Sequence, residues 1–324
     1  MKPLLILSDG HANPYALNEI LRFAKLVTPD FDVRYLGDVW GYGYDPVEFY
    51  LQIKKLDPNW NAGNHDVYGV LLHFKQIDQW MGPTVSRNAI ETDKLHLQQL
   101  GEAGIDVPSI EQIRQRERPR SEVMGNYRLV FVHASLQNFG EGYVAQYLLP
   151  NLRDRPFIET TCHIAIQDFP PPANGKTIIF TGHSHVPLLC SWSEKKGLTF
   201  HKMTYTHSQL LSDEIIFRCD EIDDSVILVN GGAVSMMRDG IAIASESGQI
   251  MRSHGILFDS SSGHLRFLQA RYSAKTVLSE LRNMYSLLPH QDRDEIGKEL
   301  AKIYYHCYIN GTDHYYQYSL DGFY

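Results

Sequence analysis

Residues 4–13 read LLILSDGHAN, an apolar run that ends in polar side chains. The first four residues have the composition of a buried strand, and residues 13–27 then repeat apolar side chains at the spacing of a helix that packs on a sheet. The same order returns in the next segments, which predict a second strand, a second helix and a short third strand at 33–36, 47–56 and 59–62. Strands that alternate with helices predict an α/β fold with a largely parallel sheet at this end of the chain.

Polar side chains follow five strand-like runs along the chain. These side chains are Asp9 and His11, Asp38, Asn64 and His65, His133, and His183 and His185. Ligands of open α/β sheets bind beyond the carboxyl ends of the strands. We therefore expect these residues to converge in space, although they are far apart in the sequence.

The residue types in these clusters are those of a metal site. Carboxylate, imidazole and amide oxygen suit Mn, Fe, Zn or Ni, and the clusters offer no thiolate. An Asp can bridge two ions, and a pair of ions ~3.5–4 Å apart can hold both the attacking and the leaving oxygen of a phosphate ester. Each motif alone has an ordinary explanation, since a histidine such as His133 after an apolar strand is more often a packed core or surface residue. The complete ordered set favours the metal interpretation.

Residues 67–121 differ from the segments on either side. Their pattern is helical and polar, with a charge-dense stretch at 114–120, and it predicts a helical insertion over the sheet. The insertion is either a lid that faces the substrate or a solvated surface excursion, and the charged stretch is either a solvated loop or a lid that steers phosphate. Strands are predicted again after residue 127, at 128–132, 177–181, 188–192, 226–229 and 255–258.

Helical periodicity returns beyond residue 272. Ser273 is a candidate N-cap, and two apolar faces at 277–288 and 296–307, separated by Pro289, predict an antiparallel helix pair. We therefore predict a main domain of residues 1–272 that contains the helical insertion at 67–121, followed by a C-terminal helical extension at 273–324. The tyrosine-rich end of the chain fits packing and an oligomer contact equally well, so the oligomeric state is left open.

The composition excludes several classes of protein. The 324 residues are 43% hydrophobic and 21% charged, which permits a sizeable core and rules out wholesale disorder. A net charge of −8 argues against binding to nucleic acid or to an anionic membrane. Four widely spaced cysteines do not make a disulfide framework, and no segment has the length of a signal peptide or a membrane span. We expect a soluble cytoplasmic protein.

Two motifs give the chain a family resemblance. Residues 9–13 (D-G-H-A-N) and 37–46 (G-D-V-W-G-Y-G-Y-D-P) resemble the D-x-H-x-N and G-D-x-x-G-Y-G-x-x-P motifs of the calcineurin-like metallophosphoesterase superfamily. The chain is most similar to the small bacterial phosphodiesterase-like branch, and the resemblance runs over residues 1–272. It implies a layered α-β-β-α sandwich, here with a helical insertion and a C-terminal helix pair.

The resemblance also implies roles for the clustered residues. Asp9, His11 and His185 would hold one divalent ion, and Asn64, His133 and His183 would hold a second. Asp38 would bridge the two ions, which could be Mn, Fe, Ni or Zn, and a hydroxide between them would attack phosphorus. Catalytic roles fall to Asp38 and His65, of which His65 would contact the phosphate and protonate the leaving group. We also expect Asn13, Asn64 and His65 to contact the substrate.

Two departures from the motifs bear on the substrate. The protein-phosphatase branch has an arginine before its G-N-H, where this chain has Ala62, and an aspartate three residues after the bridging one, where this chain has Gly41. Asp66 and Asp45 are then the candidates to orient His65, and the sequence does not place either of them. We therefore expect hydrolysis of small phosphodiester or nucleotide-type phosphate esters. The alternatives are a phosphoprotein or small-molecule phosphomonoesterase, a nuclease, and a non-catalytic metal-binding module.

Overall fold

The first apolar run forms strand β1 (Leu4–Leu7), and it is buried on both faces. Leu5 and Leu7 pack in a core on the helical side, whereas Leu4 and Ile6 pack in a core between two sheets. This alternation follows from the two-residue period of a strand. A strand with two buried faces requires two layers around it, so β1 already determines that the protein is layered.

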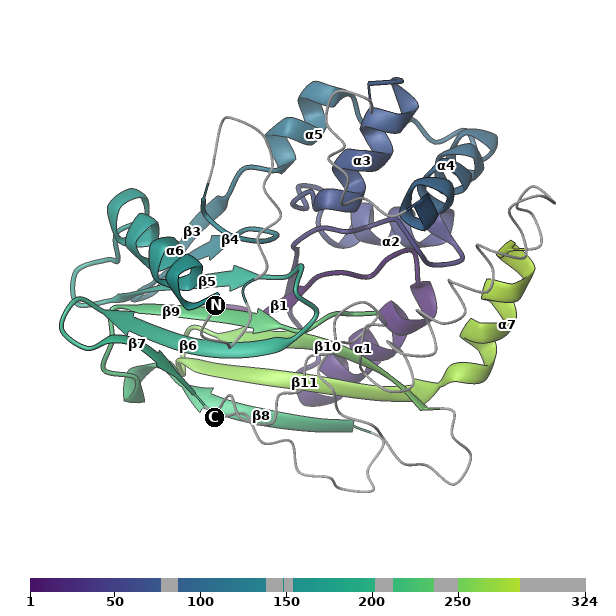
Figure 1. Ribbon diagram of the computed structural model, residues 1–324. Coiled ribbons are helices and arrows are strands. Elements are labelled where there is room, and N and C mark those ends of the chain that lie inside the picture. Colours follow the sequence, from purple (N-terminus) through teal and green to yellow (C-terminus); the bar gives the residue numbers. More distant parts are fainter. Residues whose placement is uncertain (77–86, 138–147, 149–153, 202–211, 236–249, 286–324) are drawn as a thin grey trace.

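Figure 1 shows the computed structural model, in which two mixed β-sheets lie face to face. The structure describes residues 1–76, 87–137, 148, 154–201, 212–235 and 250–285. The first sheet has the order β2 (Asp32–Tyr35), β1, β10 (Ile250–Asp259), β11 (His264–Ser273) and β8 (Ser212–Arg218). The second sheet has the order β3 (Arg120–Met124), β4 (Tyr127–Phe131), β5 (Lys176–Thr181), β9 (Val226–Gly231), β6 (Pro187–Ser193) and β7 (Gly197–Phe200).

Helices cover the outer faces of both sheets. Helix α1 (Pro14–Val27) packs on β10 and β11 of the first sheet, and α6 (Arg155–Asp168) packs on the second sheet. The other α-helices in the described part of the chain are α2 (Pro46–Leu56), α3 (Asn64–His73), α4 (Arg87–Glu102), α5 (Ile110–Arg116) and α7 (Ala274–Tyr285). Separate apolar cores lie beneath α1, between the sheets and beneath α6. The predicted α-β-β-α sandwich is therefore confirmed.

Several sequence-based expectations need correction. Residues 59–62 do not form the predicted third strand, because Asn61 donates one backbone bond to Tyr35 while Ala62 donates to Arg116 of helix α5 instead. The first sheet is mixed, since β1 pairs in parallel with β2 but antiparallel with β10. Residues 260–263 form the turn of the β10–β11 hairpin. The second C-terminal helix predicted at 296–307 and the tyrosine-rich end lie outside the described residues.

The charged stretch at 114–120 connects helix α5 to strand β3, and two of its arginines are fixed in place. The Arg116 guanidinium donates to the carbonyls of Pro58 and Trp60 and lies over the Trp60 ring. The Arg120 guanidinium binds the buried carboxylate of Asp57 at 2.8 Å. These two side chains are anchors, so neither predicted role for the stretch, a solvated loop or a phosphate-steering lid, describes them.

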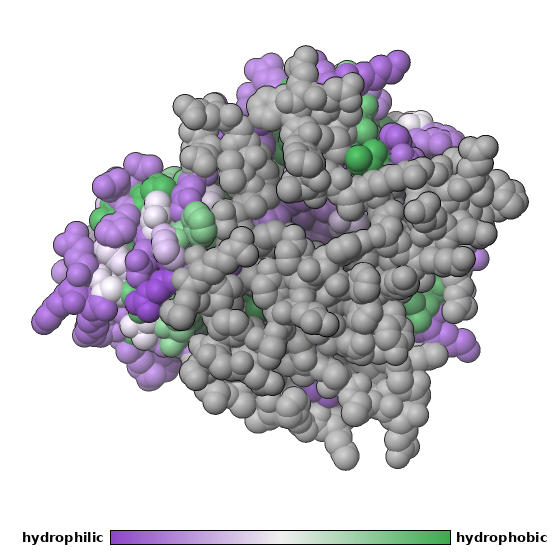
Figure 2. Space-filling model, in the orientation of Figure 1, coloured by the Kyte–Doolittle hydropathy of each residue, from purple (hydrophilic) through white to green (hydrophobic). Residues whose placement is uncertain are grey.

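The surface visible in Figure 2 is mainly hydrophilic where the residues are described, with hydrophobic side chains in small areas. The exposed large hydrophobic residues are scattered over different elements and include Leu26, Leu51, Phe74, Val123 and Ile216. None of the helices that the structure describes combines the length and the hydropathy of a membrane span.

Candidate metal centre

The clusters predicted from strand ends meet at one end of the sandwich. Asp9 and His11 follow β1, Asp38 follows β2, His133 follows β4, and His183 and His185 follow β5. The first two strands belong to the first sheet, and the other two belong to the second. The site therefore lies where both sheets end, and each sheet contributes side chains to it.

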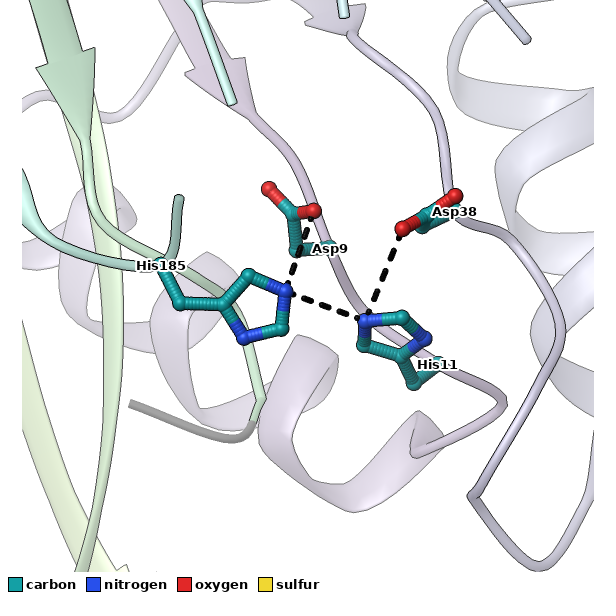
Figure 3. Close-up of side chains that lie close together, drawn as sticks. All are labelled: Asp9, His11, Asp38 and His185. Carbon is teal, nitrogen blue, oxygen red and sulfur yellow. Dashed lines mark hydrogen bonds and ion pairs between the residues drawn. The ribbon is translucent and has the colours of Figure 1, made fainter. Parts of the chain in front are cut away.

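One group of four side chains gathers around Asp9. The potential ligand atoms of Asp9, His11, Asp38 and His185 all lie within 4.8 Å of one another. In Figure 3 the ring nitrogens of His11 and His185 point toward each other and toward the two carboxylates. Nε2 of His185 is 3.3 Å from Oδ1 of Asp9, and Nε2 of His11 is 3.7 Å from Oδ2 of Asp38.

A second group shares Asp38 with the first. It consists of Asp38, His133 and His183, whose potential ligand atoms also lie within 4.8 Å of one another. Nε2 of His133 is 3.5 Å from Oδ2 of Asp38 and 3.2 Å from Oδ1 of Asn64. The amide oxygen of Asn64 thus lies beside this group, and Asp38 is the side chain common to both.

The backbone at these positions is unusual. Non-glycine residues seldom adopt a positive φ, because Cβ then crowds the backbone at a cost of roughly 1 kcal/mol or more each. Five members of the two groups do so, with φ of 57° at Asp9, 47° at His11, 57° at Asp38, 65° at His183 and 57° at His185. Left-handed non-glycine residues cluster where function requires a side-chain direction that relaxed backbone does not give. This clustering supports a functional site.

Backbone groups orient the candidate ligands. Nδ1 of His11 is 3.3 Å from the carbonyl of Trp40, and Nδ1 of His133 is 3.0 Å from the carbonyl of Leu36. A carbonyl can only accept, so each Nδ1 carries a proton, and Nε2 is the nitrogen of each ring that faces the site. Among the carboxylates, Asp9 accepts the backbone N–H of His183, and Asp38 accepts that of His65.

The two ligand carboxylates are ionised in this environment. Burial alone would raise the pKa of Asp9, but His185 and His133 outweigh it and lower the pKa to about 2. The pKa of Asp38 likewise falls well below its usual value, because the surrounding histidines outweigh burial. The pKa of His133 rises to about 9, since the negative charges of Asp38 and Asp9 overcome the effect of burial. The site therefore favours positive charge.

Divalent cations fit this set of donors. Two buried carboxylates are costly unless positive charge compensates them, and the imidazole lone pairs add neutral donors. Burial lowers the pKa of His183 to about 3 and that of His11 well below its usual value, so both rings are neutral, as metal ligands must be. Carboxylate, imidazole and amide oxygen suit borderline divalent ions such as Mn, Fe, Ni or Zn.

His65 lies beside the two groups, at the start of helix α3. Its ring is 5.0 Å from that of His11 and 4.6 Å from that of Tyr42, centroid to centroid. Burial would lower the pKa of His65, but the charges of Asp38 and then Asp93 raise it above the usual value. Nδ1 of His65 is 3.8 Å from the Asp93 carboxylate on helix α4.

The two candidate partners of His65, Asp66 and Asp45, have other structural roles. Asp66 accepts the backbone N–H groups of Asp38, Val39 and Gly63, each at 2.8 Å, and so organises the loop after β2. Asp45 caps helix α2 by accepting the N–H of Glu48. Neither candidate therefore orients His65, and the carboxylate that faces its ring is Asp93.

Asn13 has a local structural role. It is fully buried, and its side chain accepts the N–H of Ala16 and caps helix α1. Its predicted contact with a substrate stays a prediction, as do the roles assigned to Asn64 and His65 in substrate binding.

Sequence reasoning missed two residues of helix α4 that face the site. Asp93 and His96 are both buried, and His96 contacts the loop after β2 through the N–H of Gly41 and the carbonyl of Gly43. One signal was available, because Asp93 and His96 are three residues apart and lie on one face of a helix. They belong to no motif, so this spacing alone does not distinguish them from ordinary helix residues.

Comparison with known proteins agrees with this geometry. A four-layer sandwich with such a site where its sheets end defines a metallophosphoesterase by fold. The family model "Calcineurin-like phosphoesterase" matches residues 2–187, more than half of the chain, and the protein belongs to that family. It is accordingly a hydrolase that acts on phosphate esters.

Two relatives illustrate the extent of the similarity. An uncharacterised protein of Methanocaldococcus jannaschii, MJ0912, is 25% identical over 278 residues, which are 86% of this chain and 91% of the relative. The crystal structure of a metallophosphoesterase from Sphaerobacter thermophilus shares the fold with a TM-score of 0.55 and 21% identity, covering 91% of this chain and 98% of that one.

Proposed function

We infer that the protein is a dinuclear metal-dependent phosphoesterase that hydrolyses small phosphodiester or nucleotide-type phosphate esters. The observation that carries this proposal is the pair of ligand groups that share Asp38. A carboxylate common to two groups can hold two cations close together, which is the arrangement that suits in-line displacement at phosphorus. Asp9, His11 and His185 would complete one side, and Asn64, His133 and His183 the other.

The chain's own residues divide the chemical work. When bound, the cations supply Lewis-acid chemistry, since they polarise the phosphate and activate water at neutral pH. Trp40 and Leu36 hold the His11 and His133 rings through their carbonyls. His65, outside the ligand set, would stabilise the phosphate and give a proton to the leaving oxygen as its bond to phosphorus breaks.

The charge around the site favours diesters over monoesters. A monoester carries up to two negative charges near neutral pH, and a diester carries one, so monoesters gain more from an additional cationic side chain. Ala62 is buried where the protein-phosphatase branch has its arginine, and nearby Arg116 and Arg120 are bound to carbonyls and to Asp57. These contacts support a preference for phosphate groups that carry a single charge.

A substrate panel tests the proposed function. Protein stripped of metal with EDTA is reloaded with Mn, Ni, Zn or Mg and assayed on bis(p-nitrophenyl) phosphate, p-nitrophenyl phosphate and a dinucleoside polyphosphate. We expect activity only after reloading, with kcat/KM for the diester at least about tenfold above that for the monoester, a difference of about 1.4 kcal/mol. Turnover equal to that of the metal-free protein would overturn the proposed activity, and a dominant monoesterase activity would overturn the diester preference.

A further inference from the structure

Helix α4 brings a buried carboxylate to the side of His65. Asp93 is fully buried, and its Oδ2 lies 3.8 Å from Nδ1 of His65. This is an ion-pair distance, longer than a hydrogen bond. Contacts of this kind are often long without substrate and shorten when the substrate is bound. The two groups are therefore placed to form a hydrogen bond in the reacting complex.

Asp93 and His65 have no competing partners in the part of the chain that the structure describes. Neither oxygen of Asp93 accepts a hydrogen bond there, and Nδ1 of His65 is likewise buried without another partner. A buried carboxylate without hydrogen bonds is costly, and a positively charged or N–H-bearing ring is the group that relieves that cost. His65 can thus supply the N–H donor that Asp93 lacks, and Asp93 can supply the acceptor that Nδ1 of His65 lacks.

The loop after β2 leaves room for this contact at one glycine. A Cβ atom on Gly41 would lie 2.5 Å from Nδ1 of His65 and 3.3 Å from Oδ1 of Asp93. Gly41 also has φ of +91°, which other residues rarely adopt. A side chain at position 41 would therefore push the two groups apart.

His96 fixes the register of helix α4 against the same loop. Its ring nitrogens lie 3.1 Å from the N–H of Gly41 and 3.0 Å from the carbonyl of Gly43. Because residues three apart share a helix face, this contact determines where Asp93 points. The position of the carboxylate is consequently set by the buried hydrogen bonds of His96 to Gly41 and Gly43.

We propose that Asp93 is a positioning residue for His65, which makes helix α4 a part of the reaction site; the proposal rests on the proposed function. In the reacting complex Asp93 accepts a hydrogen bond from the Nδ1–H of His65 and so fixes one tautomer and one ring orientation. The opposite nitrogen, Nε2, then holds the proton that passes to the leaving oxygen when its bond to phosphorus breaks. Water supplies the oxygen of the new bond and restores the proton to the ring.

The dependence on the leaving group distinguishes this role from a structural one. Two aryl methyl phosphates are compared as substrates. The p-nitrophenyl ester releases p-nitrophenol, which leaves readily as an anion, whereas the phenyl ester releases phenol, which needs a proton to leave. For Asp93→Ala we expect kcat to fall about 10- to 100-fold with the phenyl ester and less than about threefold with the p-nitrophenyl ester. KM and metal content should stay unchanged.

Two further variants complete the kinetic test. His65→Gln should show the same dependence on the leaving group, and adding Asp93→Ala to it should cause no further loss, since the effect of Asp93 passes through His65. Glu91→Ala removes a partly exposed carboxylate of the same helix, which pairs with Lys94, and should leave both rates unchanged. Equal losses for both esters in Asp93→Ala, or additive losses in the double variant, would overturn the proposal.

A spectroscopic test works without turnover. In metal-free protein labelled with ¹⁵N-histidine, the signals of His65 are identified by their loss in His65→Gln. At a pH high enough to make the ring neutral, we expect the wild-type ring to keep its proton at Nδ1, and Asp93→Ala to convert it to a mixture of tautomers. An unchanged signal would contradict the contact. If the wild type proved to have no phosphoesterase activity, the proposed function would fail while this measurement still decided whether Asp93 fixes His65.

Discussion

Asp38 is the single residue on which both ligand groups depend. Its carboxylate lies 3.7 Å from Nε2 of His11 and 3.5 Å from Nε2 of His133. We predict that Asp38→Asn weakens metal binding by at least about 100-fold and reduces turnover to the metal-free level, because in the proposed dinuclear site the variant loses the charge that two ions would share. Elemental analysis after dialysis, together with diester hydrolysis, measures the two effects.

An exposed aspartate provides the control for this change. Asp30 pairs with Lys2 at the surface, and Asp30→Asn removes the same charge without touching the site. We expect that variant to keep its metal and its activity. An Asp38→Asn protein that retained two ions per chain would show that Asp38 is not shared between them.

The candidate ligands could be predicted from sequence, whereas the neighbour of His65 could not. Asp9, Asp38, His133 and His183 each follow an apolar strand, and strand ends that share a sheet edge meet in space. Asp93 lies inside a polar helix with no motif around it, and its proximity to His65 depends on how α4 docks. The local sequence around Asp93 does not indicate how the helix docks.

At the scale of elements, the docking of helix α4 has a measurable dependence on pH. Burial lowers the pKa of His96 in the folded protein to about 4 from 6.5, although its bond to Gly43 acts in the opposite direction. As pH falls below 6.5, His96 of the unfolded chain becomes protonated, whereas His96 of the folded protein stays neutral until about pH 4. The contribution to stability is thus complete above pH 6.5 and falls by about 3 kcal/mol by pH 4.

Comparison with a variant isolates this contribution. We predict that the difference in unfolding free energy between the wild type and His96→Gln changes by about 3 kcal/mol between pH 7 and pH 4, with the wild type losing more. Urea titrations with EDTA present measure the difference without an effect of metal release. Lys94→Gln, on the same helix, should track the wild type at every pH. A difference in unfolding free energy that did not change with pH would contradict the lowered pKa of His96.

Several of the predicted strands are buried on both faces, whereas two of the missed strands are partly exposed at sheet edges. Strands β4, β5 and β9 have continuous apolar sequences, because sheet and helix cover them on both sides. Strands β3 and β8 have alternating exposed and half-buried residues at sheet edges, and their sequences look like polar loops. The antiparallel pairing of β1 with β10 joins segments that are far apart in the sequence, which periodicity does not encode.

For the whole molecule, the site joins the two sheets. Asp9, His11 and Asp38 follow strands of the first sheet, and His133, His183 and His185 follow a strand pair of the second. Ligands from both layers mean that bound cations stabilise the folded sandwich as a unit. We predict that saturating Mn raises the thermal midpoint of EDTA-treated protein by roughly 5–15 °C.

The dependence on metal concentration checks this prediction. The midpoint, followed by differential scanning fluorimetry, should rise with the logarithm of the Mn concentration once the sites are filled. Asp38→Asn should show a much smaller rise. An unchanged midpoint in the wild type would mean that cations do not bind this site in the folded state.

The left-handed backbone at five of the candidate ligands creates a trade-off between stability and turnover. Asn and Gly relieve this conformation, so replacing Asp9, His11, Asp38, His183 or His185 by either would relax the loops while removing a ligand. Only selection for activity then retains the residue whose backbone conformation is strained. Homologues of this chain that have lost catalytic activity are therefore expected to accumulate Asn and Gly at these positions, and those substitutions would identify them as inactive.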